Sequence, residues 1–301
     1  MTCPVDPATE PGTRHRTAEL GIFARIFRRA TPAAVADAIA AAGFGLTQLN
    51  LSAFGLPTIP EPGRPQAFDP QAFDPVAVRA AFERRRVRIW GLSATYNTVH
   101  PDQDRRARET AAAAAFIPSA AALGAQVVTL CSGTRDPDDM WRRHPGNDER
   151  SAWRDLRQTL DTLLPSAAAA GVQLGIEPEP SNVIRDATTA RRLLDELGPD
   201  AQLVGIVLDP ANLLDTRTAV DQDRILAEAF DVLGPAVVCV HAKDVVASGY
   251  AAAGMGTLDY DLVFGLHAAL PRTVPVIIQD AAEDDVARTR SFLLDHARRH
   301  A

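Results

Sequence analysis

The chain has 301 residues, 46% of them hydrophobic, and a formal net charge of -7 at pH 7. This length suits one large domain with a sizeable core. The acidic balance argues against a nucleic-acid-binding surface, which needs a basic patch. No apolar run approaches the ~20 residues of a membrane span, so we expect neither nucleic acid nor a membrane as a partner.

The three cysteines, Cys3, Cys131 and Cys239, are scattered and form no CxxC motif. Together with an N-terminus that lacks the apolar segment of a secretory signal, this usage predicts a reduced, cytoplasmic location. Residues 1–17 are rich in proline, threonine and charge, and we expect them to form a flexible arm. Residues 18–301 are expected to form a single domain.

Apolar runs alternate with helical patterns along the whole of that domain. The expected strands are 20–24, 44–51, 87–93, 127–130, 172–176, 203–208, 237–240 and 274–278. The expected helices are 32–42, 76–86, 102–123, 149–170, 188–197, 222–233, 258–270 and 284–300, with a kink in the third at Pro118. Eight strand–helix alternations predict an α/β fold, a (β/α)₈ TIM barrel. The alternative is an open doubly wound sheet, but no GxGxxG or Walker A sequence supports a nucleotide-binding version of it.

A long polar insert, Ser52 to Asp74, follows the second expected strand and contains the tandem repeat QAFDP-QAFDP from Gln66 to Pro75. The insert could be a lid over a barrel. It could also be a loop expansion without function, because lengthening a surface loop costs little free energy.

Four successive apolar runs in the second half each end on a polar residue: Glu177, Asp209, His241 and Gln279. On parallel strands closed into a barrel, these side chains would meet at the carboxyl ends of the strands, where barrels bind ligands. Carboxylates, an imidazole and an amide oxygen suit one divalent cation, with Mn²⁺ or Mg²⁺ favoured and Co²⁺ or Zn²⁺ possible. We therefore expect a metal centre there.

Further polar residues close to these strand ends are candidates for catalysis. Glu177 is a candidate base as well as a ligand, and Glu179 and Lys243 are candidate catalytic neighbours. The alternative for Glu179 is bracing of its loop, and for Lys243 a salt bridge with Asp244 on the barrel rim.

The candidates for substrate binding are Asn97, His100, Trp141, Asn182 and Asn212. Asparagine also caps loops well, and His100 precedes Pro101 in what could be a simple turn. Trp141 could form an aromatic wall over a sugar.

Several motifs together resemble the xylose-isomerase-like barrel superfamily, the sugar phosphate isomerase/epimerase group, from about Glu19 to Leu294. They are GIEPE at Glu177, LDPAN at Asp209, VHAKD at His241, and the downstream segments GMGTLDY and EDDV. The resemblance implies one divalent metal held by a Glu, an Asp, a His and a Glu on strands 5 to 8. The first three match Glu177, Asp209 and His241. The fourth falls on Gln279, a departure, and Asn212 stands where many epimerases carry histidine.

The resemblance implies a metal-dependent isomerase or epimerase of a sugar or related polyhydroxy carbonyl compound, acting through a metal-stabilised enediolate. Relatives often form homo-oligomers. An amide cannot act as a base, so a two-base epimerisation would need a substitute for Gln279: Glu179, Asp280, His100 or Lys243. A lyase or dehydratase that β-eliminates from a keto-sugar or keto-cyclitol is the alternative. An abasic-site endonuclease shares this barrel, but the acidic charge and seven histidines count against it.

Overall fold

The computed structural model describes residues 18–59, 73–214 and 217–301. The expected arm at 1–17 and the QAFDP repeat as far as residue 72 lie outside these ranges. The described start of the insert forms a short 3₁₀ turn, Leu51–Phe54, which ends at Gly55 with φ 78°. A lid function of the insert stays a prediction.

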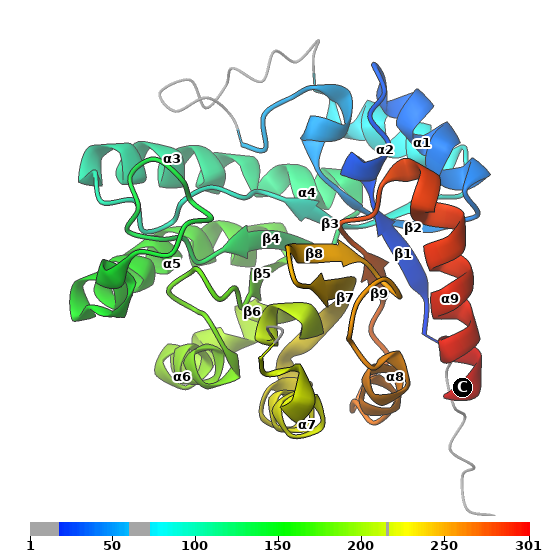
Figure 1. Cartoon of the computed structure of the whole chain (residues 1–301). Helices are drawn as coiled ribbons and strands as arrows, with labels where there is room; N and C mark the ends of the chain where they lie inside the picture. The colour runs from blue at the N-terminus through cyan, green and yellow to red at the C-terminus, as the bar shows by residue number, and fades with distance from the viewer. Residues whose placement is uncertain (1–17, 60–72, 215–216) are drawn as a thin grey trace, which may run out of the picture.

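Within the described residues, eight parallel strands close into a barrel (Figure 1). They are β1 (Leu20–Phe23), β2 (Leu46–Leu49), β3 (Arg88–Ser93), β4 (Val127–Cys131), β5 (Gln173–Glu177), β6 (Val204–Leu208), β7 (Val237–Val246) and β9 (Val276–Ile278). Each strand pairs with the next along the chain, and β9 pairs with both β7 and β1. This closure confirms the predicted (β/α)₈ barrel and excludes the open sheet.

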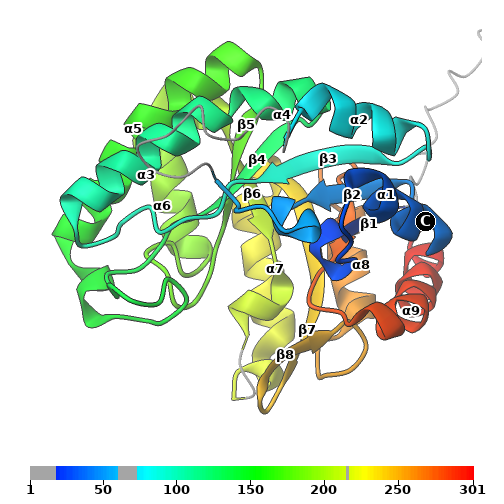
Figure 2. The ribbon, with the colours of Figure 1, turned by 90° about the horizontal axis from the view of Figure 1, so that it is seen from above.

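The helices lie around the outside of the strands (Figure 2). They are α1 (Pro32–Ala41), α2 (Pro75–Glu83), α3 (Gln103–Phe116), α4 (Pro118–Leu123), α5 (Arg150–Ala170), α6 (Ala187–Leu197), α7 (Gln222–Leu233), α8 (Tyr260–Ala268) and α9 (Val286–Arg299). The expected helix at 102–123 is two helices, because Pro118 ends α3 instead of only kinking it. No helix in the described parts of the chain is long and apolar enough to cross a membrane.

The inside of the barrel changes from apolar to polar along its axis. A separate apolar cluster joins residues of six strands, which can touch one another only inside the barrel: Leu46, Trp90, Val127, Val207, Val238, Cys239 and Ile277. Nearer the carboxyl ends of the strands the buried residues are polar, among them Gln48, Ser93, Thr129 and His241. The larger core cluster includes buried residues of both the strands and the helices. The barrel therefore carries its chemistry at one end, above an apolar plug.

Strand β7 differs from the expectation that it ends at His241. It continues to Val246 and turns back into β8 (Gly249–Ala252), which pairs with it antiparallel. Figure 2 shows this hairpin projecting beyond the other strands at one end of the barrel. The side chains of a strand alternate between its two faces, so His241 and Lys243 share one face. Asp244, on the opposite face, accepts hydrogen bonds from the backbone of Gly254 and Leu258.

Candidate functional site

Three of the four expected metal ligands come together at the carboxyl ends of neighbouring strands. Glu177 is the last residue of β5, Asp209 follows β6 directly, and His241 lies within β7. One potential ligand atom of each lies within 4.8 Å of the others. Nδ1 of His241 is 3.3 Å from Oε1 of Glu177. In the described residues, this is the one such cluster of three or more histidine, cysteine or acidic side chains.

Buried polar atoms without a hydrogen-bond partner concentrate in this centre. Within the described residues they include Asp209 Oδ2, His241 Nδ1, Asn212 Oδ1 and Gln279 Oε1. Buried polar groups are nearly always hydrogen-bonded, so these four atoms, of which Asp209 Oδ2 has only an ion pair with Lys243, indicate that a further group satisfies them. Carboxylate, imidazole and amide oxygen are ligands for a divalent cation. The residues present therefore fit a metal site.

Lys243 supplies a buried positive charge next to this centre. Its Nζ lies 3.1 Å from Asp209 Oδ2, and the two groups form an ion pair without the angles of a hydrogen bond. The same Nζ lies 3.9 Å from the centre of the Tyr250 ring. Burial disfavours the charge, but attraction to Asp209, Glu177 and Glu179 outweighs it and raises the pKa of Lys243 above its ordinary value. Lys243 therefore stays protonated, which argues against it as the substitute base.

The carboxyl groups of the site have pKa values that are driven apart. Burial and repulsion by Glu177 raise the pKa of Glu179 to about 8. Burial would also raise the pKa of Glu177, but attraction to His241 and Lys243 lowers it overall. Burial raises the pKa of Asp209 to about 6, although Lys243 opposes the rise. Adjacent carboxyl groups with opposite shifts are the arrangement that separates a base from an acid.

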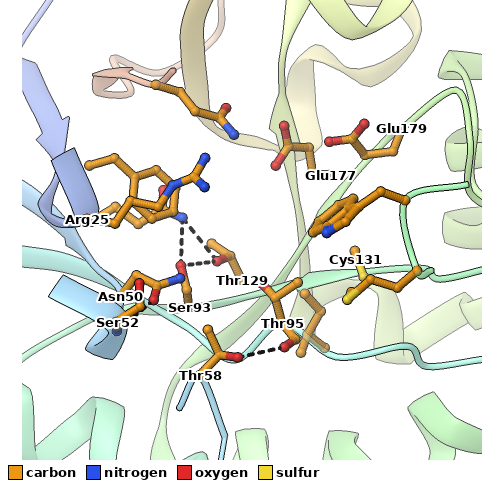
Figure 3. A pocket seen from close by; sticks show the side chains of 16 residues that line it. Arg25, Asn50, Ser52, Thr58, Ser93, Thr95, Thr129, Cys131, Glu177 and Glu179 are labelled. Atoms are coloured by element: carbon orange, nitrogen blue, oxygen red, sulfur yellow. Dashed lines mark hydrogen bonds between the residues drawn. The ribbon is translucent and has the colours of Figure 1, made fainter. Parts of the chain in front are cut away.

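A cavity of about 290 Å³ opens beside Glu177 and has two chemically different walls. Figure 3 shows the carboxylates of Glu177 and Glu179 on one side and Arg25 with several hydroxyl side chains on the other. Gln279 and the half-exposed Trp141 also line the cavity. The hydroxyl and amide wall consists of Gln48, Asn50, Ser52, Thr58, Ser93, Thr95 and Thr129. Such a wall can hydrogen-bond a polyhydroxy compound.

Two contacts orient the groups around the cavity. Asn212 Nδ2 donates to Oε1 of Glu177 at 3.0 Å and to the carbonyl of Pro178 at 3.1 Å. Arg25 donates to Asp280 at 2.9 Å, and the backbone of Asp280 has a left-handed φ of 53°. Asn212 thus contacts a candidate ligand, and Arg25 already has a counter-ion.

Four of the expected substrate-binding residues do not line the cavity: Asn212, described above, and Asn97, His100 and Asn182. Asn97 exchanges hydrogen bonds with the backbone of Thr134 at 2.9 and 3.0 Å. His100 bonds the carbonyl of Pro137 and the backbone N–H of Asp102. Oδ1 of the fully buried Asn182 accepts from the backbone N–H of Gly133 at 2.9 Å. The contacts of Asn182 correspond to the loop-capping alternative, and those of Asn97 and His100 to the alternative of a turn ahead of Pro101, so we do not carry the three residues into the proposed site.

Gln48, a residue of β2, was not expected at the site. Its Oε1 is 2.8 Å from Nε2 of His241, and its Nε2 is 3.1 Å from both Ser93 Oγ and Thr129 Oγ1. Arg25 and the hydroxyl wall were not expected there either. The available signal for Gln48 is a pair of polar residues, Thr47 and Gln48, between the leucines of an expected buried strand, because a buried polar side chain needs a partner.

Solved structures with the same fold include several sugar epimerases. The 3-keto-D-glucoside 4-epimerase YcjR from E. coli is 17% identical, with a TM-score of 0.68 over 91% of this chain and 99% of that one. D-Allulose 3-epimerase from Methylomonas sp., in complex with D-allulose, is 14% identical, with a TM-score of 0.68 over 93% and 97%. An L-ribulose 3-epimerase is 15% identical, with a TM-score of 0.70 over 94% and 96%.

A comparison with curated proteins gives no match. The profile of the xylose isomerase-like TIM barrel family, however, matches residues 32–291. This match spans most of the chain and agrees with the closed barrel, so the chain belongs to the xylose isomerase-like TIM barrel family.

Proposed function

We propose that this protein is a divalent-metal-dependent isomerase or epimerase of a sugar or related polyhydroxy carbonyl compound. The observation that carries the proposal is the cluster of Glu177, Asp209 and His241, in which Asp209 and His241 each have a buried atom without a hydrogen-bond partner, beside a cavity with a hydroxyl-rich wall. The family and the epimerase names of its structural neighbours support the same class.

The cavity lining favours a neutral substrate. Arg25 is the one cationic side chain among the described lining residues, and Asp280 neutralises it. A phosphate group needs cationic or clustered N–H partners, so we expect an unphosphorylated polyol. Trp141 lines the same cavity and offers an apolar face to a sugar ring.

Glu177, Asp209 and His241 would hold the cation, with Gln279 as a candidate fourth ligand. When bound, the cation polarises the substrate carbonyl and makes the adjacent C–H more acidic. Glu177, oriented by Asn212, is the group we expect to remove that proton. Glu179 lies beside it and is the candidate proton donor.

Both proton carriers come from the end of β5, and Gln279 at the end of β9 cannot act as a base. This arrangement favours proton transfer on one face of the substrate, as in aldose–ketose isomerisation, over a two-base inversion. The same pair of carboxyl groups is also compatible with a second candidate function, β-elimination from a keto-sugar or keto-cyclitol, because elimination needs one base and one acid.

The test is a substrate screen in D₂O with the protein reconstituted separately with Mn²⁺, Mg²⁺, Co²⁺ and Zn²⁺. We expect a ketose or aldose to incorporate deuterium and yield an isomer, detected by NMR. An ultraviolet-absorbing enone would support the lyase instead. Asp209→Ala should abolish both bound metal and turnover, whereas Asp195→Ala on the exposed side of α6 should not. Absence of bound metal after every reconstitution would refute the proposal.

A further inference from the structure

A closed hydrogen-bond network inside the barrel reaches His241 from three other strands. Gln48 on β2 contacts Ser93 on β3 and Thr129 on β4 through its Nε2, and Thr129 Oγ1 lies 3.2 Å from Ser93 Oγ. The amide Oε1 of Gln48 faces Nε2 of His241 at 2.8 Å. Gln48 and His241 are each 1% exposed, so water competes little for these bonds.

The two ends of the Gln48 amide impose a direction on the network. Its NH₂ group can only donate, and the two hydroxyls in front of it can accept. Its Oε1 can only accept, so the His241 nitrogen that faces it must carry a proton. In a neutral imidazole the other nitrogen, Nδ1, then carries a lone pair. This is the nitrogen that faces Glu177 and has no hydrogen-bond partner in the described chain.

The reversed amide would give the opposite result. With Nε2 of Gln48 turned toward His241, the ring would accept there and carry its proton on Nδ1. A proton on Nδ1 and a cation bound to Nδ1 exclude each other. The orientation of one buried amide therefore decides whether the imidazole is ready to bind a cation.

We propose that Gln48 is a positioning residue that holds His241 as the Nε2–H tautomer, leaving Nδ1 free to ligate the divalent cation. The proposal rests on the proposed function in that it assumes a cation at Glu177, Asp209 and His241. Partners of this kind fix the ring orientation and tautomer of ligating histidines, and their loss lowers metal affinity about 10- to 100-fold.

The tautomer can be measured without activity or metal. In protein labelled with ¹⁵N-histidine, the ring nitrogen shifts show which nitrogen is protonated, and His241→Asn identifies the signal. Spectra recorded across a pH series separate the neutral ring from the doubly protonated one, and we expect the neutral ring of His241 in the metal-free wild type to carry its proton on Nε2. A neutral ring protonated on Nδ1 would overturn the proposal.

Titration calorimetry with MnCl₂ gives the second readout. Gln48→Met keeps the shape of the side chain but lacks the acceptor, so Mn²⁺ affinity should fall about 10- to 100-fold. Gln48→Glu restores an acceptor and should recover most of that loss. Thr47→Val, the matched control, removes a buried hydroxyl of the same strand that bonds the carbonyl of Ile22 away from the cavity, and it should bind Mn²⁺ nearly as the wild type does.

Equal Mn²⁺ affinity in Gln48→Met and wild type would overturn the proposal. If Gln48→Met fails to fold, Gln48→Asn, which withdraws the amide oxygen from His241, is tested in the same two assays. A wild type that binds no cation at all would refute the proposed function. The tautomer experiment would still decide, in that case, whether Gln48 determines which nitrogen of His241 is protonated.

Discussion

The two sides of the barrel mouth bury polar groups in opposite ways. On the side of β2 to β4, Gln48, Ser93 and Thr129 are hydrogen-bonded to one another. On the side of β6 to β9, Asp209 and Gln279 are buried to a similar degree, but each has an orphaned oxygen. Burial of polar groups alone therefore does not distinguish a structural network from a binding site.

The difference lies in the unmet hydrogen-bonding capacity. A satisfied network stabilises the fold, and breaking it leaves stranded partners that lower the free energy of unfolding. Orphaned groups cost stability until a ligand arrives, so substitution there should mainly change binding and turnover. The first three predictions below test this contrast, and the fourth uses a site away from the mouth as a reference.

The largest effect is expected at Glu177. We predict that Glu177→Gln lowers kcat/KM by about 10²- to 10⁴-fold, because the amide cannot take the substrate proton. Kinetics on the substrate found in the screen, with elemental analysis of the same sample, check this. Near-full activity with metal still bound would show that Glu177 is not the base.

A substitution of Lys243 tests how much the ion pair with Asp209 contributes to the free energy of unfolding. Removing it in Lys243→Met leaves Asp209 buried beside an apolar side chain, and losing one partner of a buried ion pair costs about 3–5 kcal/mol. Urea unfolding of metal-free protein measures the loss, and Mn²⁺ should recover part of it. The double variant with Asp209→Asn should be more stable than Lys243→Met alone. If the losses of unfolding free energy from the two substitutions simply add in the double variant, Lys243 and Asp209 are not coupled.

Asn97 and Asn212 allow a direct comparison, because the amide of Asn97 is fully hydrogen-bonded whereas Oδ1 of Asn212 has no partner in the described chain. Asn97→Ala strands the backbone of Thr134, so we expect a loss of about 1–3 kcal/mol in unfolding free energy and unchanged kcat/KM. Asn212→Ala frees Glu177 and should lower kcat instead, with a smaller loss of stability. Urea unfolding and kinetics on both variants decide. A kinetic defect in Asn97→Ala would return that residue to the substrate site.

The smallest effect concerns His267, which lies on α8 and whose Nε2 is 2.8 Å from the carbonyl of Val274. Burial lowers the pKa of His267, although the bond to Val274 opposes the shift. The unfolded chain therefore binds this proton more readily, and stability is lost as the pH falls below about 6.5. His267→Gln, which can still donate to Val274, should show a shallower loss of unfolding free energy between pH 7.5 and pH 5. An unchanged slope would exclude this contribution.

The sequence predicted the barrel and the three cluster residues because both depend on local patterns. An apolar run that stops at Glu177 before Pro178, or at Asp209 before Pro210, marks the strand end and the candidate ligand at once. The same reasoning placed the end of β7 too early. His241 looked like a strand end, but β7 continues because it pairs with β8, and that pairing depends on a turn at residues 246–249.

The loops and the Gln48 network could not be predicted in the same way. Asn97 and Asn182 were expected to face substrate, but their partners are backbone groups of the segment around Gly133 and Thr134, far away in sequence. Gln48 reaches His241 across 193 positions of the chain. Neither pairing leaves a local signature, because each depends on how the barrel closes.

Side chains along β7 alternate between the two faces of the strand, and this alternation restricts insertions and deletions between Val240 and Asp244. His241 and Lys243 face the site, while Asp244 faces outward and holds the following loop. Inserting or deleting one residue between Val240 and Asp244 would exchange the faces for every residue beyond that point. Lys243 would then leave Asp209, and Asp244 would turn toward the carboxylates. Related chains of different length should therefore carry their insertions in the hairpin turn after Val246, never within this segment.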